Sequence, residues 1–512
     1  MNVVGQVGGV VGGIGLATLL VAHRRALRLG GLVAWGAGLG AVALALLPDV
    51  AAARLAAAGA VGLVIAVAGA WALDRRPYLL AFATLACVPA RIPVDIGSDT
   101  SNLLLPLYAV VAALALSLAW RLFRDDRRAR ELGPLAVPVA AFVVWTSLSV
   151  LWTPDVRKGL IFLGAFLLPF GLLAIGCARL PWRGRWLTWL WGALVATALA
   201  YAIVGGYQWI TREVFWNPSV IVFNAYAPFF RVNSVFWDPS VYGRYLVVAI
   251  LATLAGIVLG GVHGWRLAGL YAVVAATWLG LVISFSQSSF VALGVGIVVA
   301  AAVAWGRRPV LALVALALAA AAVTLAVPSV RNELVDRSRS GLNKVTSGRS
   351  NLVAQGLRIA VDHPVAGAGV GGFNREYARR VGIQGKDPKR TASHTTPVTV
   401  AAEEGVIGLA LFAWLVATAA WATLFRLGRG FTSRVSLAVG VSLAAIFVHS
   451  LAYNAFFEDP TTWALLGLVG LVARVPKKPP LEPQAEPVGS DDGRPPDPVT
   501  LDDTRPADLA SG

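Results

Sequence analysis

The sequence is poor in charged residues. Only 14% of its 512 residues are charged, whereas 57% are hydrophobic, and the mean hydropathy is +0.71. A soluble globular chain carries about 25% charged residues, so this composition excludes that class and indicates a polytopic membrane protein. The sequence contains no recognisable soluble catalytic domain and no repeat array. Any chemistry therefore belongs to the membrane-embedded core and its loops.

Cysteine and clustered metal ligands are also scarce. The two cysteines, Cys87 and Cys177, fall in or at the ends of predicted spans near opposite faces, so we expect neither a structural disulfide nor a cysteine metal site. The five histidines lack metal-ligand spacing, and the two long loops described below contain no Asp-x-Asp pair. A divalent-metal mechanism has no visible ligand set, and we expect no cofactor. The N-terminus lacks the basic segment of a cleavable signal peptide, so we expect none.

Long apolar runs recur along the chain. Each is close to the roughly 20 residues that a helix needs to cross a hydrocarbon core, which favours helices over barrel strands. The predicted fold is an all-α polytopic transmembrane helix bundle of about 12–15 spans with two long outer-face loops. The predicted spans are 2–22, 31–47, 52–73, 77–94, 103–120, 134–151, 159–176, 187–206, 242–261, 267–284, 288–304, 309–327, 397–424, 435–452 and 461–474.

The distribution of arginine predicts the topology. Every second connection between predicted spans is rich in arginine, and the positive-inside rule makes these connections cytoplasmic. They hold Arg24, Arg25, Arg28, Arg75, Arg76, the arginines of 121–130 and 179–185, Arg266, Arg307, Arg308 and those of 426–434. The intervening short loops hold only Arg54, Arg91, Arg157 and Lys158. We therefore expect a multi-pass protein of the cell membrane, and we interpret the net charge of +16 as a topology signal rather than as nucleic-acid binding.

This topology divides the chain into parts. They are the N-terminal transmembrane helices 1–206, an aromatic outer loop 207–241, transmembrane helices 242–327, a basic outer loop 328–396, C-terminal transmembrane helices 397–476 and a tail 477–512. The tail is rich in Pro, Asp, Glu and Gly without apolar periodicity, which predicts a disordered cytoplasmic segment.

The two outer loops differ in kind. The basic loop 328–396 is either a solvated surface that touches anionic headgroups or a site for a phosphorylated lipid, because guanidinium groups match phosphate oxygens. Its spacing G-x-G-x-x-G at 367–372 has no βαβ unit around it, so a dinucleotide site is not expected. The aromatic loop 207–241 is typical of the membrane interface and could roof a cavity at headgroup level. Arg231 and Arg244 are either phosphate contacts or interfacial arginines that reach headgroups.

The stretch ASHTTPVTVAAEEGVIGL (392–409) places a histidine at the start of an apolar helix. Thr395 and Thr396 can cap this helix and Pro397 suits its first turn, so His394 should lie just outside the N-terminus. The helix dipole there disfavours imidazolium and attracts anions, so a neutral base and a diphosphate could share one site. The alternative is a histidine that caps the helix or lies at the surface.

Carboxylates form two further groups. Glu403 and Glu404 should lie about two turns into the helix, where a carboxylate marks either a functional site or a pairing with an arginine of another helix. His449, at the outer end of span 435–452, forms a second polar cluster with Glu458 and Asp459 of the next outer loop.

Three stretches resemble the O-antigen ligase family of polytopic glycosyltransferases, which includes lipopolysaccharide O-antigen ligases and polysaccharide polymerases. They are RVNSVFWDPSVYGRYL (231–246), SGRSNLVAQGLRIAVDHPVAGAGVGGFN (347–374) and SHTTPVTVAAEEGVIGL (393–409). Their order, their topology and the long loop between the last two fit the family. The stretch 449–468 is similar to the family's C-terminal part more loosely, and the first eight spans match by hydropathy only.

The resemblance implies transfer of a glycan from a polyprenyl diphosphate carrier to an acceptor hydroxyl on the outer face, without metal or nucleotide sugar. By motif position, Arg231 and Arg349 look like the family's diphosphate-holding arginines and His394 like its essential histidine, which would act as general base. Arg244 is a further diphosphate candidate, and Glu403, Glu404, His449 and Glu458 are candidate supporting residues. The implied partners are a polyprenyl diphosphate-linked glycan, a glycan, lipid or cell-wall acceptor, and membrane lipids, with no nucleic acid.

Two questions stay open at this point. Three positions depart from the usual family pattern, namely Thr395, Ser289–Phe290 and Pro239–Ser240, and the sequence does not separate a ligase from a polymerase. A transporter or flippase of polyprenyl-linked glycans is the competing class, and a non-catalytic scaffold is a third. Transporters often show internal repeats and polar groups at the membrane midplane, whereas here no repeat is evident and the polar clusters gather at the outer face.

Overall fold

The computed structural model describes residues 2–47, 52–96, 99–182, 185–227, 229–306, 349–382, 394–425 and 430–475, with residues 308, 311, 312, 315 and 427. Most of the predicted span 309–327 and the whole tail 477–512 lie outside the described residues. Residues 1–475 form one compact unit.

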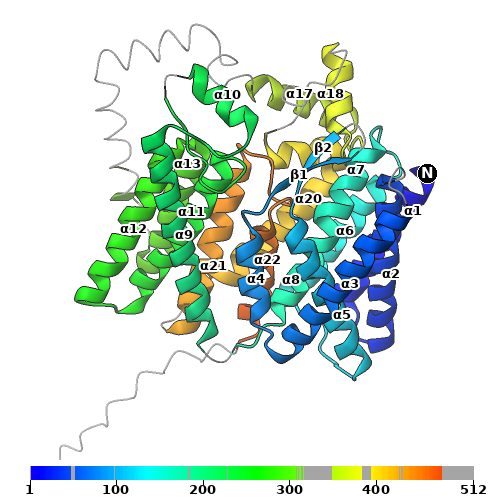
Figure 1. The fold of residues 1–512 in the computed structure, drawn as a ribbon, viewed down its shortest axis with the longest axis horizontal. Coiled ribbons are helices and arrows are strands. Elements are labelled where there is room, and N and C mark those ends of the chain that lie inside the picture. Colours follow the sequence, from blue (N-terminus) through cyan, green and yellow to red (C-terminus); the bar gives the residue numbers. More distant parts are fainter. Residues whose placement is uncertain are drawn as a thin grey trace, which may run out of the picture. The chain divides into compact units, whose positions relative to one another are not determined.

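The fold is an all-α membrane bundle, as predicted (Figure 1). In the described part, ten helical segments are long and apolar enough to cross a membrane, and two more apolar helices are shorter. The helices are α1 (Asn2–Val21), α2 (Arg25–Leu46), α3 (Ala52–Arg75), α4 (Leu79–Cys87), α5 (Leu105–Phe123), α6 (Ala136–Ser149), α7 (Val156–Phe162), α8 (Leu168–Ala178), α9 (Trp186–Thr211), α10 (Pro218–Tyr226), α11 (Pro239–Gly260), α12 (Trp265–Ser284), α13 (Gln287–Trp305), α17 (Arg349–Asp362), α18 (Phe373–Val381), α20 (Thr396–Leu424), α21 (Phe431–Ser450) and α22 (Pro460–Ala473). A π-helical turn, Leu163–Leu167, joins α7 and α8 into one span.

The predicted span 77–94 is wrong. Its helix, α4, has nine residues, so its length of about 14 Å falls short of a hydrocarbon core of about 30 Å. Pro89 lies just beyond the helix end, as expected for a residue that cannot continue a helix. The chain then forms an antiparallel hairpin of β1 (Ile92–Ile96) and β2 (Asp99–Leu103), in which Ile92 pairs with Leu103.

Helix α21 lies between two hydrophobic cores. Its residues Val439, Leu443 and Ile446 belong to a core shared with α1, α5, α6, α8 and α22. Leu437, Val441 and Ala445, spaced four apart on another face, belong to a core shared with α9, α11 and α13. In Figure 1 the orange helix α21 accordingly separates the green helices from the blue and cyan ones. Residues at both ends of α21 are therefore placed by two helix groups at once.

One end of the bundle holds a buried charge network. Glu131 is fully buried and pairs with Arg28 and, at 2.8 Å, with Arg179, which also pairs with Asp126. Three connections that the sequence predicted on one side of the membrane are therefore in contact at this end of the bundle. Helix α22 is capped by Asp459 at its start and by Arg474 at its end, where Arg474 donates to the Ala178 carbonyl close to this network. The other end of α22 lies about 21 Å away by helical rise, and that end carries the candidate site.

Helix α20 is broken at Gly405, where φ is +67° and ψ is −164°. The prediction of one continuous helix was therefore wrong. The segment 364–372 lies against the break: the amide of Val406 donates to the Pro364 carbonyl at 2.8 Å, and the amide of Gly369 donates to the Glu403 carbonyl at 2.8 Å. Backbone groups that the break removes from the helix thereby regain partners, which a membrane-embedded chain requires.

The glycines of 367–372 are explained by this packing. Gly367, Gly369 and Gly371 all have positive φ, and a Cβ on each would lie within 2.5 Å of neighbouring backbone, namely Glu403 for the first, Thr153 for the second and Gly159 for the third. The glycine spacing serves a close approach of three chain segments.

Substitution of Gly405 tests the break. A Cβ there would lie 2.2 Å from the Val365 carbonyl oxygen in a left-handed backbone conformation, so we expect Gly405→Ala to lower the free energy of unfolding by about 2 kcal/mol. The matched control is Gly256→Ala in α11, where a Cβ meets no atom within 4 Å and helix propensity favours alanine by about 0.5–1 kcal/mol. Thermal unfolding in detergent measures both. Equal melting of Gly405→Ala and wild type would contradict the proposed strain.

Candidate functional site

The loop 451–459, between α21 and α22, contacts the start of α20, which directly follows His394. Thr395 Oγ1 donates to the Leu451 carbonyl at 3.0 Å, and Thr396 Oγ1 donates to Asn454 Oδ1 at 2.9 Å. Thr395 is the N-cap residue of α20, but neither threonine side chain caps the helix, so that part of the prediction was wrong. His394 lies just outside the helix N-terminus, as predicted, and is partly buried. The threonines instead fasten the start of α20 to the loop 451–459.

Arg244 occupies the interior next to this loop. It lies in α11, is 3% exposed, and its Nε is 2.9 Å from Asp459 Oδ2. Asp459 also accepts from the Thr461 amide at 2.9 Å and thereby caps α22. Both terminal nitrogens of Arg244 lack a hydrogen-bond partner within the described residues. A buried guanidinium whose two terminal nitrogens have no described partner favours an anion beside it, because an unpaired buried donor is costly.

His449 and Tyr453 complete the surroundings of Arg244. The guanidinium carbon lies 5.9 Å from the Tyr453 ring centre, and the His449 ring centre lies 5.7 Å from that of Tyr453. His449 is fully buried, with Nε2 3.1 Å from Ser288 Oγ. We name Arg244, His449, Tyr453, Glu458 and Asp459 the Arg244 cluster. The predicted grouping of His449 with Glu458 and Asp459 is therefore part of a larger arrangement that includes an arginine from α11.

A serine-rich turn connects this cluster with Arg231. Arg231 Nε donates to the Ser284 carbonyl at 3.3 Å, at the end of α12. Two residues on, Ser286 Oγ lies 3.4 Å from Ser288 Oγ, and Ser288 contacts His449. The serine turn therefore lies between Arg231 and His449, which belongs to the Arg244 cluster. Ser288 was not predicted, since nothing in the local sequence distinguishes it from its neighbouring serines.

Arg91 is a second residue that the sequence did not assign to the site. It follows α4, and its Nη2 donates to the Glu458 carbonyl at 3.0 Å. Burial raises the pKa of the Glu458 carboxyl, whereas the guanidinium groups of Arg91 and Arg244 oppose this rise. Burial also raises the pKa of the Tyr453 hydroxyl, so this side chain is a neutral donor at the site. The usable signal for Arg91 was its place among the few cations of the intervening loops.

Glu403 and Glu404 have structural partners. The Glu403 carboxylate accepts from the Gly371 amide at 2.9 Å and from the Phe373 amide at 3.1 Å, so it caps α18. Glu404 is 3% exposed, and its carbonyl accepts from the Trp145 indole at 2.9 Å. No described arginine pairs with either carboxylate. These glutamates hold the break in α20 and the loop that lies against it.

Helix α17 begins at Arg349, in the position where the sequence placed a diphosphate arginine. Leu352 and Ile359 of α17 pack with Phe373 and Tyr377 of α18 and with Ala402 of α20. Figure 1 shows α17 and α18 beside each other at the same side of the bundle as α10. The flank that carries Arg349 is therefore built on the broken half of α20, which His394 precedes.

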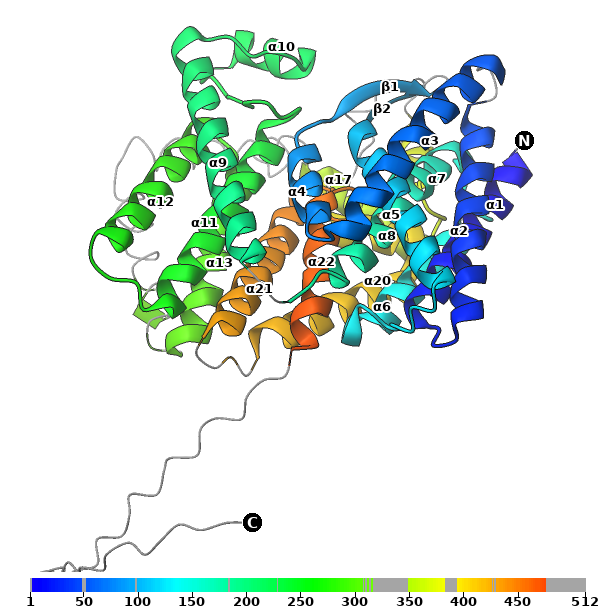
Figure 2. The same ribbon diagram turned by 60° about the horizontal axis from the view of Figure 1, so that its bottom comes forward.

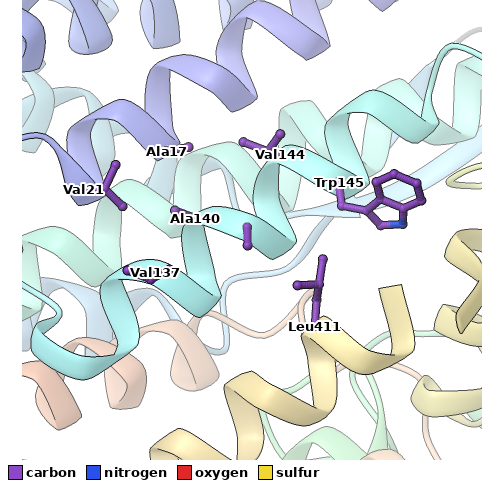
Figure 3. Close-up of a pocket in the computed structure, with 8 residues that line it drawn as sticks. Ala17, Val21, Val137, Ala140, Val144, Trp145 and Leu411 are labelled. Carbon is purple, nitrogen blue, oxygen red and sulfur yellow. The ribbon is translucent and has the colours of Figure 1, made fainter. Parts of the chain in front are cut away.

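A groove elsewhere in the bundle has no catalytic character (Figure 3). It has a volume of about 430 Å³ and lies between α1, α6 and α20. Figure 3 shows Val137, Ala140 and Val144 along α6, with Leu411 of α20 across from them. Its lining contains no titratable side chain, so we assign no chemistry to it.

Comparison with known families supports the resemblance found in the sequence. Residues 270–413 match the family described as O-antigen ligase. The match begins within α12, includes α13, α17, α18 and His394, and ends beyond the break in α20. It does not reach Arg231, Arg244 or the loop 451–459. No curated protein matches the chain. Over residues 270–413 the match bears out the resemblance to the O-antigen ligase family that the motifs predicted.

Removal of the Glu403 carboxylate tests its capping role. In Glu403→Ala the amides of Gly371 and Phe373 lose their acceptor, and we expect their hydrogen exchange to accelerate about tenfold or more. Glu404→Gln is the control, because the Glu404 carboxyl does not bind these amides. Hydrogen exchange measured by mass spectrometry would contradict the role if peptides covering 369–375 exchanged alike in Glu403→Ala and wild type.

The pH dependence of stability tests the environment of Glu458. A pKa raised in the folded state means that the folded protein binds the proton more tightly than the unfolded chain. This stabilisation is complete below the ordinary value of 4.5 and is lost as the pH rises through the folded value. We expect Glu458→Gln, which cannot ionise, to gain melting temperature relative to wild type as the pH rises from 4.5 toward neutrality. A difference that stays constant with pH would contradict the assignment.

Proposed function

We propose that this protein is a glycosyltransferase that moves a glycan from a polyprenyl diphosphate carrier to an acceptor hydroxyl on the outer face of the cell membrane, without a metal ion. One observation carries the proposal: the loop 451–459 holds both the start of α20, next to His394, and the Asp459 carboxylate that fixes Arg244. The loop 451–459 thus positions both a candidate general base, His394, and a buried guanidinium, Arg244, whose terminal nitrogens have no partner among the described residues. The O-antigen ligase match over residues 270–413 gives the reaction class.

His394 acts as the general base in this proposal. The N-terminus of α20 carries positive partial charge, which disfavours imidazolium and leaves a ring that can accept a proton. The acceptor hydroxyl gives its proton to the imidazole as its oxygen attacks the anomeric carbon. The bond between that carbon and the diphosphate oxygen breaks, polyprenyl diphosphate leaves, and the anomeric configuration inverts.

The arginines neutralise the leaving group. Arg231 and Arg349 hold the diphosphate, and Arg244 offers it the two terminal nitrogens that no described residue occupies. Guanidinium groups fixed in advance stabilise the charge that develops on the diphosphate without reorganisation. Asp459 and His449 are positioning residues, because Asp459 pairs with Arg244 and His449 contacts Ser288 in the turn next to Arg231. Glu403 and Glu404 act through the fold of α20 and α18.

The fixed geometry of Arg244 has a direct consequence for specificity. Its Nε is engaged by Asp459, so only the outer edge of the guanidinium, formed by Nη1 and Nη2, faces the anion. This edge matches two oxygens of one phosphate in a bidentate contact. A lysine cannot reproduce both contacts from the same position, because its ammonium is a single point of charge.

Reconstituted transfer tests the proposal. Purified protein in liposomes is given a polyprenyl diphosphate-linked oligosaccharide and a panel of hydroxyl acceptors, with EDTA present. We expect wild type to release polyprenyl diphosphate and form product, and His394→Ala to lose about a hundredfold or more of kcat. His363→Ala is the matched control, since His363 is exposed within the same family match and should leave the rate unchanged.

Two further variants test how Arg244 contributes to donor binding. Arg244→Lys keeps the charge but loses the bidentate edge, and Asp459→Asn leaves Arg244 without its anionic partner, so both should raise the KM for the donor. The size of the product separates ligation from polymerisation. Movement of the intact lipid-linked glycan across the bilayer by wild type, with no product from any acceptor, would replace the enzyme by a transporter.

A further inference from the structure

Helix α10 presents an apolar face outward from the protein. Its inward positions are Val220, which is 7% exposed, and the partly buried Asn224, spaced one helical turn apart. The outward positions include Ile221, Val222 and Tyr226, of which Tyr226 is 88% exposed. The helix contains no charged residue. A helix of a soluble surface directs polar residues outward, so this face is built for an apolar cover.

The exposed face continues a lipid-facing surface. Helix α9 is one of the ten candidate spans, and it exposes Ile203, Tyr207 and Ile210 along one side. The Tyr207 ring lies 6.4 Å from that of Phe215, which is itself exposed and leads toward α10. Figure 2 shows α10 crossing the end of α9, rather than extending it. An apolar helix that crosses the end of a span is suited to lie in the plane of the membrane interface.

A cation marks the same level. Arg212, directly after α9, lies over the Trp209 ring at 4.3 Å and over the Phe230 ring at 5.4 Å. Tryptophan and arginine together are typical of the depth at which acyl chains give way to headgroups. The α9 end and α10 therefore share the chemistry of one interfacial layer.

Helix α10 is also tied to Arg231. Asn224 donates to the Arg231 carbonyl and accepts from its amide, both at 2.9 Å. The Arg231 guanidinium lies 5.6 Å from the Phe223 ring centre. At the other end of α10, Asn217 Nδ2 donates to the Trp237 carbonyl at 2.6 Å, just before α11 begins. The depth of α10 is thus transmitted to the segment that carries Arg231 and leads to Arg244.

From these contacts we propose that α10 is an interfacial helix whose outward face is covered by the acyl chains of the outer leaflet. In this proposal, the hydrogen bonds of Asn224 hold Arg231 at the depth of the lipid headgroups. The occupant is lipid, since the face is continuous with the lipid-facing side of α9. The second part of the proposal rests on the proposed function, because it assigns Arg231 to the diphosphate of a membrane-embedded donor.

Spin labels in nanodiscs test the seat of α10. Single cysteines replace Val222 on α10, Ile210 on lipid-facing α9 and Arg379 on cationic α18, in a Cys87→Ala background, with Cys177 left in place because it is buried. The Cys87→Ala protein without an added cysteine is treated with the same spin label, to check that Cys177 does not react. The measured quantity is the ratio of oxygen to nickel-chelate accessibility, which rises with depth in the bilayer. We expect the ratio at Val222→Cys to approach that at Ile210→Cys and to exceed that at Arg379→Cys severalfold.

Two results would contradict the proposal that lipid covers the outward face of α10. A ratio at Val222→Cys equal to that at Arg379→Cys means that the helix faces water. Dipolar broadening between labels at this position, relieved by dilution with unlabelled protein, means that a second copy covers the face. Neither readout needs transferase activity, so the seat of α10 is decided even if the proposed function fails.

The link to Arg231 is tested by Asn224→Ala. Loss of its two hydrogen bonds should raise the KM for the lipid-linked donor about five- to tenfold with kcat little changed, because the chemistry at the acceptor is untouched. Ser219→Ala is the matched control, since Ser219 is an exposed polar residue of the same helix. Unchanged KM in Asn224→Ala, with wild-type accessibility at position 222, would separate α10 from the donor site.

Discussion

The ion pair between Arg244 and Asp459 is the contact on which the candidate site depends. It joins α11 to the start of α22 inside the bundle, where both side chains are almost fully buried. Breaking a buried pair leaves an uncompensated charge, so the pair fixes the loop 451–459 relative to α11. Because the same loop accepts hydrogen bonds from Thr395 and Thr396, the position of His394 follows from it. The terminal nitrogens of the guanidinium stay without a partner among the described residues, which is why we propose that the same arginine also binds an anion.

A second constraint is the break in α20. The helix cannot satisfy its own backbone around Gly405, and segment 364–372, between α17 and α18, supplies partners. Glycines at 367, 369 and 371 allow that approach, and the Glu403 carboxylate caps α18. The basic flank that begins at Arg349 is in this way attached to the element that carries His394. A continuous helix would have offered no place for this loop.

The sequence was a good guide wherever one physical preference dominated. Long apolar runs predicted the helical bundle, and arginine-rich connections predicted a common end, at which Arg28 and Arg179 now share Glu131. The order Thr395, Thr396, Pro397 predicted a helix start and so located His394. It misassigned 77–94, because an apolar run containing Pro89 and Pro93 reads as hydrophobic without being able to remain helical. The sequence also placed Glu403 and Glu404 in an unbroken helix, because a single glycine within an apolar run does not predict a helix break.

Composition, apolar period and local helix signals were therefore determined by the sequence alone, because bilayer thickness and backbone hydrogen bonding act on each segment separately. Those rules also singled out Arg231, Arg244, His394 and His449 as candidate residues, whereas Arg349 was singled out only by its position in a motif that resembles the O-antigen ligase family. Only the tertiary structure decided which of them meet. Arg244 with Asp459 and Ser288 with His449 are contacts between segments that are far apart in the chain, and no local preference specifies them. They arise because α21 packs against two cores at once, which brings the ends of several helices to one loop.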